Sequence, residues 1–131
     1  MNDKYKYEYF ELAPRNPNIN NLYYEKNSYN KALQEFFSVN RPLYDRYDND
    51  TVHYKSDSHW VIGTIIDYIN DDDEYLVEVK IDEQFKFINS EEYVIGFKLM
   101  TKGNPIIDKD GIKRYVIDKV LYATLINKDF L

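Results

Sequence analysis

The sequence predicts one α+β domain, mainly β, in which about six to seven strands form a small closed or half-closed β-barrel with one packed helix. Apolar residues recur at every second position in several short runs, as in strands, and one segment alone has the spacing of an amphipathic helix. A length of 131 residues is typical of one domain. We therefore expect a single domain over residues 1–131. It comprises an N-terminal extension with a strand and an Asn/Pro-rich loop over 1–27, a helix over 28–39 and a β-rich core over 59–131.

The composition is acidic, rich in tyrosine and free of cysteine. Lys and Arg number 17 against 23 Asp and Glu, and the basic residues are scattered singly, so binding to nucleic-acid phosphates is not expected. The absence of cysteine excludes disulfides, thiolate zinc sites and cysteine nucleophiles. No apolar run approaches the length of a membrane span or a signal-peptide core, so we expect a soluble protein with an unprocessed N-terminus.

Residues 2–12 alternate charged and aromatic side chains, which is a strand pattern. Tyr5, Tyr7 and Tyr9 fall on one side of this strand and Phe10 on the other. The segment is either an ordinary edge strand or an arm that adds to the sheet edge of a neighbouring subunit. Tyrosine is enriched where proteins meet. The candidate binding residues are therefore Tyr5, Tyr7, Tyr9 and Phe10, with Tyr23 and Tyr24 of the following loop as secondary candidates.

The helix over residues 28–39 is predicted from its spacing. Ser28 can cap its N-terminus, and Asn40 and Pro42 end it. An apolar stripe at every third or fourth position is expected to pack on the sheet. This stripe consists of Tyr29, Ala32, Leu33, Phe36 and Phe37.

The clearest strand signal lies between residues 61 and 82. Residues 61–69 carry apolar side chains on both faces, so we expect this strand to be covered on both sides. Residues 70–74 are polar and supply a turn. In residues 75–82 apolar and polar side chains alternate, which predicts one buried face and one wet face. The two runs predict a β-hairpin.

The C-terminal part of the chain is predicted to form further short strands. Gly96 marks a bulge or a close backbone approach, and Asp110 with Gly111 predicts a tight hairpin turn. The last strand has apolar side chains on both faces and is expected to be buried. The predicted strands cover residues 84–89, 92–100, 114–117 and 119–131.

His53 lies in the polar, aspartate-rich segment 43–58, and His59 follows it. Two histidines with no further strong ligand at a standard spacing are a weak metal signal, so we expect a solvated loop and no metal. The acidic run 71–74 lacks the alternating ligands and the glycine of an EF-hand loop. It is expected to be a solvated turn.

Five short segments carry a family resemblance through their order. A loop and helix, NPNINNLYYEKNSYNKALQEFF, are followed by a histidine, a strand from Ile62 to Asp67, and the segment YLVEVKI. A Gly-Phe strand, IGFKLM, and a last strand from Ile117 to Tyr122 complete the order. In these segments the chain resembles the prohead (capsid maturation) proteases of tailed phages, which share their fold with the herpesvirus assemblins.

The resemblance implies a serine nucleophile activated by a histidine. By position the base would be His53 or His59. The nucleophile would stand in or beside the IGFKLM strand, where Ser90 and Thr101 carry the nearest hydroxyls. Because the expected nucleophile position is itself apolar, the sequence favours a binding module that keeps the fold without the activity.

The residues and the family resemblance together suggest three functions. The first is a non-enzymatic phage or viral structural or capsid-assembly protein that binds other virion or assembly proteins and can form a homo-oligomer. The alternative is an active prohead maturation serine protease. A second alternative is an acidic inhibitor of a host nucleic-acid-binding defence enzyme, suggested by the net charge of -6. We expect no cofactor, no nucleic-acid or membrane partner, and a location in the virion or the host cytoplasm.

Overall fold

The computed structural model describes residues 5–14, 18, 21–45, 61–71 and 74–131. Both histidines and the middle of the acidic run lie outside these residues. The predicted fold class is confirmed, because the described chain is mainly β and contains one α-helix. None of the helices in the described part is long and apolar enough to cross a membrane.

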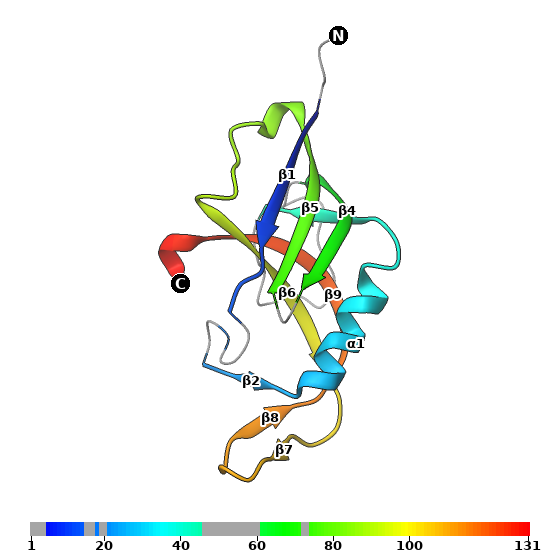
Figure 1. The fold of residues 1–131 in the computed structure, drawn as a ribbon, viewed down its shortest axis with the longest axis vertical. Helices are drawn as coiled ribbons and strands as arrows, with labels where there is room; N and C mark the ends of the chain where they lie inside the picture. Colours follow the sequence, from blue (N-terminus) through cyan, green and yellow to red (C-terminus); the bar gives the residue numbers. More distant parts are fainter. Residues whose placement is uncertain (1–4, 15–17, 19–20, 46–60, 72–73) are drawn as a thin grey trace.

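The main sheet has six strands and curls through 182° into a half-barrel (Figure 1). Its strand order is β1-β5-β4-β3-β9-β6, so β1 and β6 are the edges. The long hairpin predicted from the sequence is confirmed as β4 paired antiparallel with β5. The strands are β1 (Tyr5–Glu11), β3 (Arg41–Tyr44), β4 (Val61–Asp71), β5 (Glu74–Asp82), β6 (Tyr93–Thr101) and β9 (Ile117–Asn127).

Helix α1 (Lys26–Phe36) packs against β9 through its apolar stripe. The N-cap is Glu25 and not Ser28, because the Glu25 carboxylate accepts hydrogen bonds from the backbone N–H groups of Asn27 and Ser28. The Ser28 hydroxyl instead accepts a bond of 3.0 Å from the N–H of Ile117 at the start of β9. This contact joins the first turn of the helix to the sheet.

The core lies between α1 and the concave face of the half-barrel. Every second residue of β5 is buried, as predicted for a strand with one wet face. Leu33 and Phe36 of the helix are buried, and the ring of Phe37 stacks on that of Tyr68 with 4.6 Å between the centroids. The β5 residues that enter the core are Tyr75, Val77, Val79 and Ile81.

Strand β3 was not predicted, because Pro42 suggested only the end of the helix. It lies inside the sheet, antiparallel to β4 and parallel to β9, and Leu43 is fully buried between them. A strand of four residues carries too little periodicity to be recognised, so its position depends on its two neighbours.

Three further predictions need correction. Residues 84–89 do not form a strand; a 3-10 turn, η1 (Glu83–Phe85), and a loop take the chain away from β5 and back beside β1. The last strand ends at Asn127, and residues 128–130 form the 3-10 turn η2 (Lys128–Phe130). Gly96 lies at no irregularity of β6, and what approaches it closely is the Ile126 side chain on β9.

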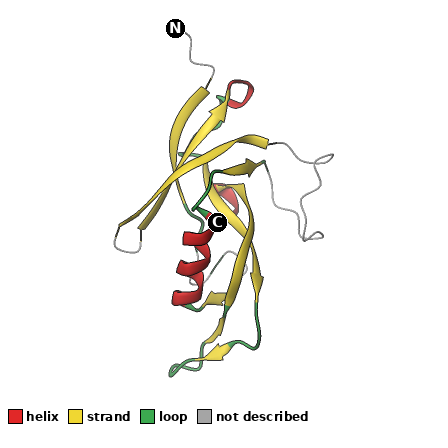
Figure 2. Ribbon diagram, turned by 90° about the vertical axis from the view of Figure 1, so that its right-hand side faces the viewer, coloured by secondary structure: helices red, strands yellow, loops and turns green. Residues whose placement is uncertain are grey.

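A second, three-stranded sheet extends from one end of the molecule (Figures 1 and 2). It consists of β2 (Tyr23–Tyr24), β8 (Lys113–Tyr115) and β7 (Ile106–Ile107) in that order. Strands β7 and β8 form the hairpin expected from Asp110 and Gly111, and Gly111 has φ of 79°. The backbone at Gly111 is therefore in the left-handed region that glycine adopts without strain.

Candidate functional site

The three tyrosines of β1 lie on one exposed surface. Tyr5, Tyr7 and Tyr9 are 41%, 55% and 46% exposed, and they alternate with residues that turn toward the interior. Their antiparallel partners on β5 carry charged side chains. We call this surface the tyrosine face; it comprises Tyr5, Tyr7, Tyr9 and Glu11 of β1 with Glu78, Lys80 and Asp82 of β5.

The charged residues of β5 hold two of the rings. The Lys80 ammonium lies 4.0 Å from the centroid of the Tyr5 ring, within range of a cation–π contact. The Tyr9 hydroxyl donates a hydrogen bond to Glu78. The negative charge of Glu78, its hydrogen bond, burial and the charge of Asp67 raise the pKa of Tyr9, so this hydroxyl stays protonated and keeps its bond to Glu78. The face thus presents ordered aromatic rings with polar groups at their tips.

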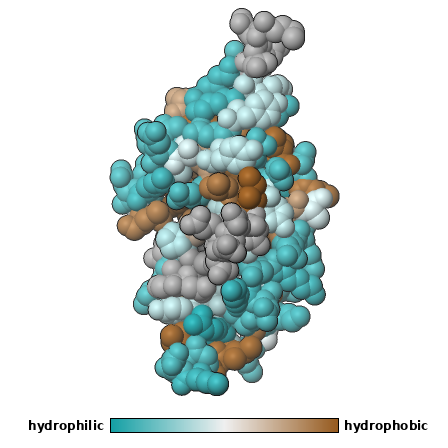
Figure 3. Space-filling view, in the orientation of Figure 1, coloured by the Kyte–Doolittle hydropathy of each residue, from teal (hydrophilic) through white to brown (hydrophobic). Residues whose placement is uncertain are grey.

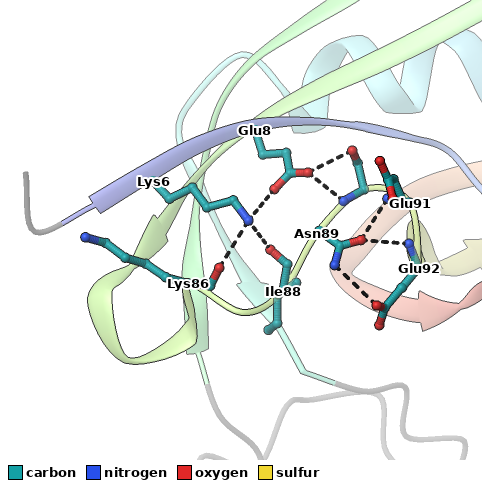
Figure 4. Close-up of polar contacts among 8 residues, drawn as sticks. Lys6, Glu8, Lys86, Ile88, Asn89, Glu91 and Glu92 are labelled. Carbon is teal, nitrogen blue, oxygen red and sulfur yellow. Dashed lines mark hydrogen bonds and ion pairs between the residues drawn. The ribbon is translucent and has the colours of Figure 1, made fainter.

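On the opposite side of β1, two charged side chains form hydrogen bonds with the loop over residues 86–92 (Figure 4). The Lys6 ammonium donates to the carbonyls of Lys86 at 3.1 Å and Ile88 at 2.7 Å. It also lies 2.8 Å from Oε2 of Glu8. Glu8 Oε1 accepts from the N–H and the hydroxyl of Ser90 at 2.7 and 2.8 Å. We call this group the Lys6–Glu8 contact.

Just beyond the C-terminal end of β1, backbone contacts join the chain to strand β6. Leu12 forms a parallel bridge with Ile95 of β6, and the N–H of Ala13 donates to the Ile95 carbonyl at 2.8 Å. The two edges of the half-barrel therefore meet at this point. An N-terminal arm free to join another subunit does not fit this arrangement, because β1 pairs with β5 over its full length and is closed on its other side by these contacts.

Phe10, Tyr23 and Tyr24 do not all belong to an exposed surface. Phe10 is fully buried in the core, because its position in the alternation of β1 points inward, so the prediction that it binds a partner is wrong. Tyr24 is half-buried, with its ring stacked on Tyr29 and its hydroxyl bonded to Asn18. Tyr23 is half-buried too, with the Arg114 guanidinium 5.5 Å from its ring centroid.

The β7–β8 hairpin exposes a second apolar surface that the sequence analysis missed. Ile106 and Ile107 are 52% and 70% exposed. Figure 3 shows apolar side chains gathered at the end of the molecule where this hairpin lies. Two consecutive isoleucines before an Asp-Gly turn were the signal that could have revealed it. We call this the hairpin surface; it comprises Tyr23, Ile106, Ile107, Lys109, Lys113 and Arg114.

Asp108 holds the hairpin in shape. Its Oδ1 accepts from the N–H groups of Asp110 and Ile112, each at 2.9 Å, and its Oδ2 accepts from Arg114 Nε at 2.8 Å. The N–H of Ile112, the Arg114 guanidinium and the N–H of Asp110 outweigh desolvation and lower the pKa of Asp108. The turn is therefore ordered by an ionised side chain.

The candidate catalytic residues do not form one site in the described part of the chain. Ser90 donates its hydroxyl to Glu8, whose lowered pKa makes it a poor proton acceptor. Thr101 is exposed at the C-terminal end of β6, whereas Ser90 precedes the start of that nine-residue strand. The two hydroxyls therefore lie at opposite ends of β6 and not at one site. His53 and His59 lie outside the described residues. Among the described residues no cluster of metal-ligating side chains occurs.

Comparison with known proteins gives no match to a family model, a curated protein or a solved structure. The surfaces of the chain itself are therefore the basis on which a function is proposed.

Proposed function

We propose that this chain is a non-enzymatic structural or assembly protein of a phage or virus, and that its tyrosine face binds a protein subunit of the particle, either another virion or assembly protein or a copy of this chain. The observation that carries the proposal is the row of three exposed tyrosines at every second residue of β1. Covering large exposed aromatic rings with a partner is favourable, and tyrosine is among the residue types that are enriched at protein interfaces.

The setting of these rings supports the proposal. A tyrosine loses few rotatable bonds on binding, and here Lys80 and Glu78 already restrict two of the rings. Strand β1, which carries these rings, pairs with β5 over seven residues, so a partner would bind a surface whose backbone is already ordered. Preorganisation of this kind reduces the entropy that association must overcome.

The protease alternative has less support. Ser90 is hydrogen-bonded through both its hydroxyl and its N–H to Glu8, which is the pattern of a residue that shapes a loop. A nucleophilic hydroxyl needs a base of suitable pKa, and burial, which raises the pKa of Glu8, is outweighed by its bonds to Lys6 and Ser90. These contacts favour the binding function over the hydrolytic one.

Site-specific photo-crosslinking tests the proposal. A photoreactive phenylalanine analogue is placed at Tyr7 and, as a control, at Val39, which is also 55% exposed but lies in the turn between α1 and β3. Crosslinks in assembled particles are then identified by mass spectrometry. We expect a single virion or assembly protein crosslinked from position 7 and not from position 39. Equal yields at both positions would contradict the proposal.

A parallel assay tests the alternative. The protein is incubated with capsid and scaffold precursors of its own virus, beside the Ser90→Ala variant. This variant removes the hydroxyl but retains the N–H that donates to Glu8, so the loop should stay folded. We expect no cleavage by either protein. Cleavage by the wild type that disappears in Ser90→Ala would restore the protease function.

A further inference from the structure

We propose that the hairpin surface of one copy binds the tyrosine face of another, so that the chains associate head to tail. This inference rests on the proposed function of the tyrosine face and names a second copy of this chain as its partner. Three properties of the described residues carry it: the shapes of the two surfaces, their charges and their positions on the molecule.

The first property is chemical fit between the apolar groups. Consecutive strand residues point to opposite faces, so Ile107, which is 70% exposed, projects from one face of the narrow hairpin and Ile106 from the other. Ile107 can therefore pack on the flat row that the tyrosines form along β1. Aliphatic side chains pack well on aromatic rings, and each surface alone leaves apolar area in water. Contact between copies would cover both at once.

The second property is opposite charge. Residues 102–116 contain four basic and two acidic side chains, in a chain whose formal charge is -6. The ion pair between Asp108 and Arg114 neutralises one charge of each sign, which leaves three basic side chains and one acidic side chain. The tyrosine face has three acidic residues, Glu11, Glu78 and Asp82, and one basic residue, Lys80. The hairpin surface is thus basic and the tyrosine face acidic. This favours contact between the two different surfaces over contact between two hairpin surfaces or two tyrosine faces.

The third property is position. The hairpin lies at one end of the molecule and the strand pair β1–β5 lies toward the other, in both views (Figures 1 and 2). When copies stack end to end, two different surfaces form a heterologous contact, and only an antiparallel two-fold pair would use both contacts within one dimer. A heterologous contact leaves one hairpin and one face free at the ends of every open oligomer, so growth continues into a filament or closes into a ring.

The ordered turn of the β7–β8 hairpin also supports association through the hairpin surface. Asp108 and Gly111 keep the two isoleucines displayed in the free chain, so little ordering is required when they bind. The contact is small compared with a permanent interface, which predicts association that depends strongly on concentration.

Sedimentation velocity of two complementary variants tests the inference on the full-length chain. Tyr7→Ser impairs the face and Ile107→Ser impairs the hairpin. We expect the wild type to increase in average mass from micromolar to millimolar concentration, and each variant alone to associate about tenfold more weakly. A one-to-one mixture should form a dimer that grows no further, because it retains one intact face and one intact hairpin.

Matched controls address folding and charge. Val39→Ser removes an equally exposed apolar side chain outside both surfaces, and it should associate as the wild type does. Lys109→Glu should weaken association in low salt, whereas Lys31→Glu on the exposed side of α1 makes the same charge change and should not. Circular dichroism confirms that each variant is folded.

Several results would overturn the inference. A wild type that stays monomeric at millimolar concentration would exclude self-association, yet a specific crosslink from position 7 to another protein would still support the proposed function. Undiminished dimerisation by either variant alone would indicate a symmetric contact. A mixture that forms no dimer would show that the two surfaces do not bind each other.

Discussion

Strand β1 and the β7–β8 hairpin both expose large apolar side chains, but they are held in different ways. In β1 the outward tyrosines alternate with inward residues, one of which, Phe10, is fully buried in the core. In the hairpin both isoleucines of β7 are exposed, and order comes from the turn through Asp108 and Gly111. The tyrosine face is therefore part of the main six-stranded sheet, whereas the hairpin surface lies on the separate three-stranded sheet.

This difference determines what each surface can tolerate. The tyrosine face cannot move without disturbing the core, because inward and outward residues share one short strand. The hairpin can open locally while the main sheet remains folded, since few buried apolar contacts tie it down. Substitutions in the two regions should therefore separate global stability from local order.

The largest effect is expected for Phe10→Ala. Removing a fully buried aromatic side chain should lower the free energy of unfolding by about 3–5 kcal/mol, measured by urea denaturation. The matched control is Phe87→Ala, because Phe87 is 73% exposed, and its effect should be within about 0.5 kcal/mol. Similar values for the two variants would mean that β1 does not pack on the core.

The next effect concerns Glu8→Ala. The Glu8 side chain is only 18% exposed and accepts two hydrogen bonds from Ser90, so the free energy of unfolding should fall by about 1–3 kcal/mol. Urea denaturation at neutral pH measures it. An effect below about 0.5 kcal/mol would show that the Lys6–Glu8 contact does not stabilise the packing of β1 against the loop over residues 86–92.

Glu8 should also make stability depend on pH. Burial raises the pKa of Glu8, but the bonds from Lys6 and Ser90 and the charge of Lys6 together lower it. A carboxyl group with a lowered pKa in the folded state stabilises the protein above its ordinary value, and this contribution is lost as the pH falls through the lowered value. The wild type should therefore lose more stability in acid than Glu8→Gln, in denaturation curves collected from pH 7 downward.

Glu25 and Asp108 also have lowered pKa values, and they contribute to acid sensitivity in both proteins. Only the difference between the wild type and Glu8→Gln reports on Glu8. Parallel stability curves for the two proteins across the acid range would contradict the assignment.

Asp108→Ala should have a smaller and more local effect. Loss of its three accepted hydrogen bonds should speed amide exchange of Ile112 and the neighbouring hairpin residues, while amides of β4 and β5 exchange as before. Exchange monitored by NMR measures this. If the β4 and β5 amides also exchange faster, the hairpin belongs to the same cooperative unit as the main sheet.

The smallest effect on stability is expected for Tyr7→Ala. Its ring is 55% exposed, so the free energy of unfolding should change by no more than about 0.5 kcal/mol. The same substitution should nevertheless reduce binding of the particle protein crosslinked from position 7, measured by calorimetry. A stable variant with unchanged affinity would move the interface away from the tyrosine face.

The sequence by itself determined the elements whose signals are local. The β4–β5 hairpin, the alternation of β1, the apolar stripe of α1 and the Asp-Gly turn were all predicted, because side-chain spacing reflects the period of a strand or helix. The short strand β3 and the loop over 84–89 were not, since a few residues carry no reliable period. Alternation also divided β1 correctly into two faces.

Only the tertiary structure decided which of those faces is covered. Phe10 and Tyr9 are adjacent aromatic residues, yet one is in the core and the other is exposed. What distinguishes them is the arrangement of the sheet and helix around β1, and the partners of Lys6 and Glu8 lie 82 residues away along the chain. Local spacing assigns residues to a face, but burial depends on segments that reach that face only after folding.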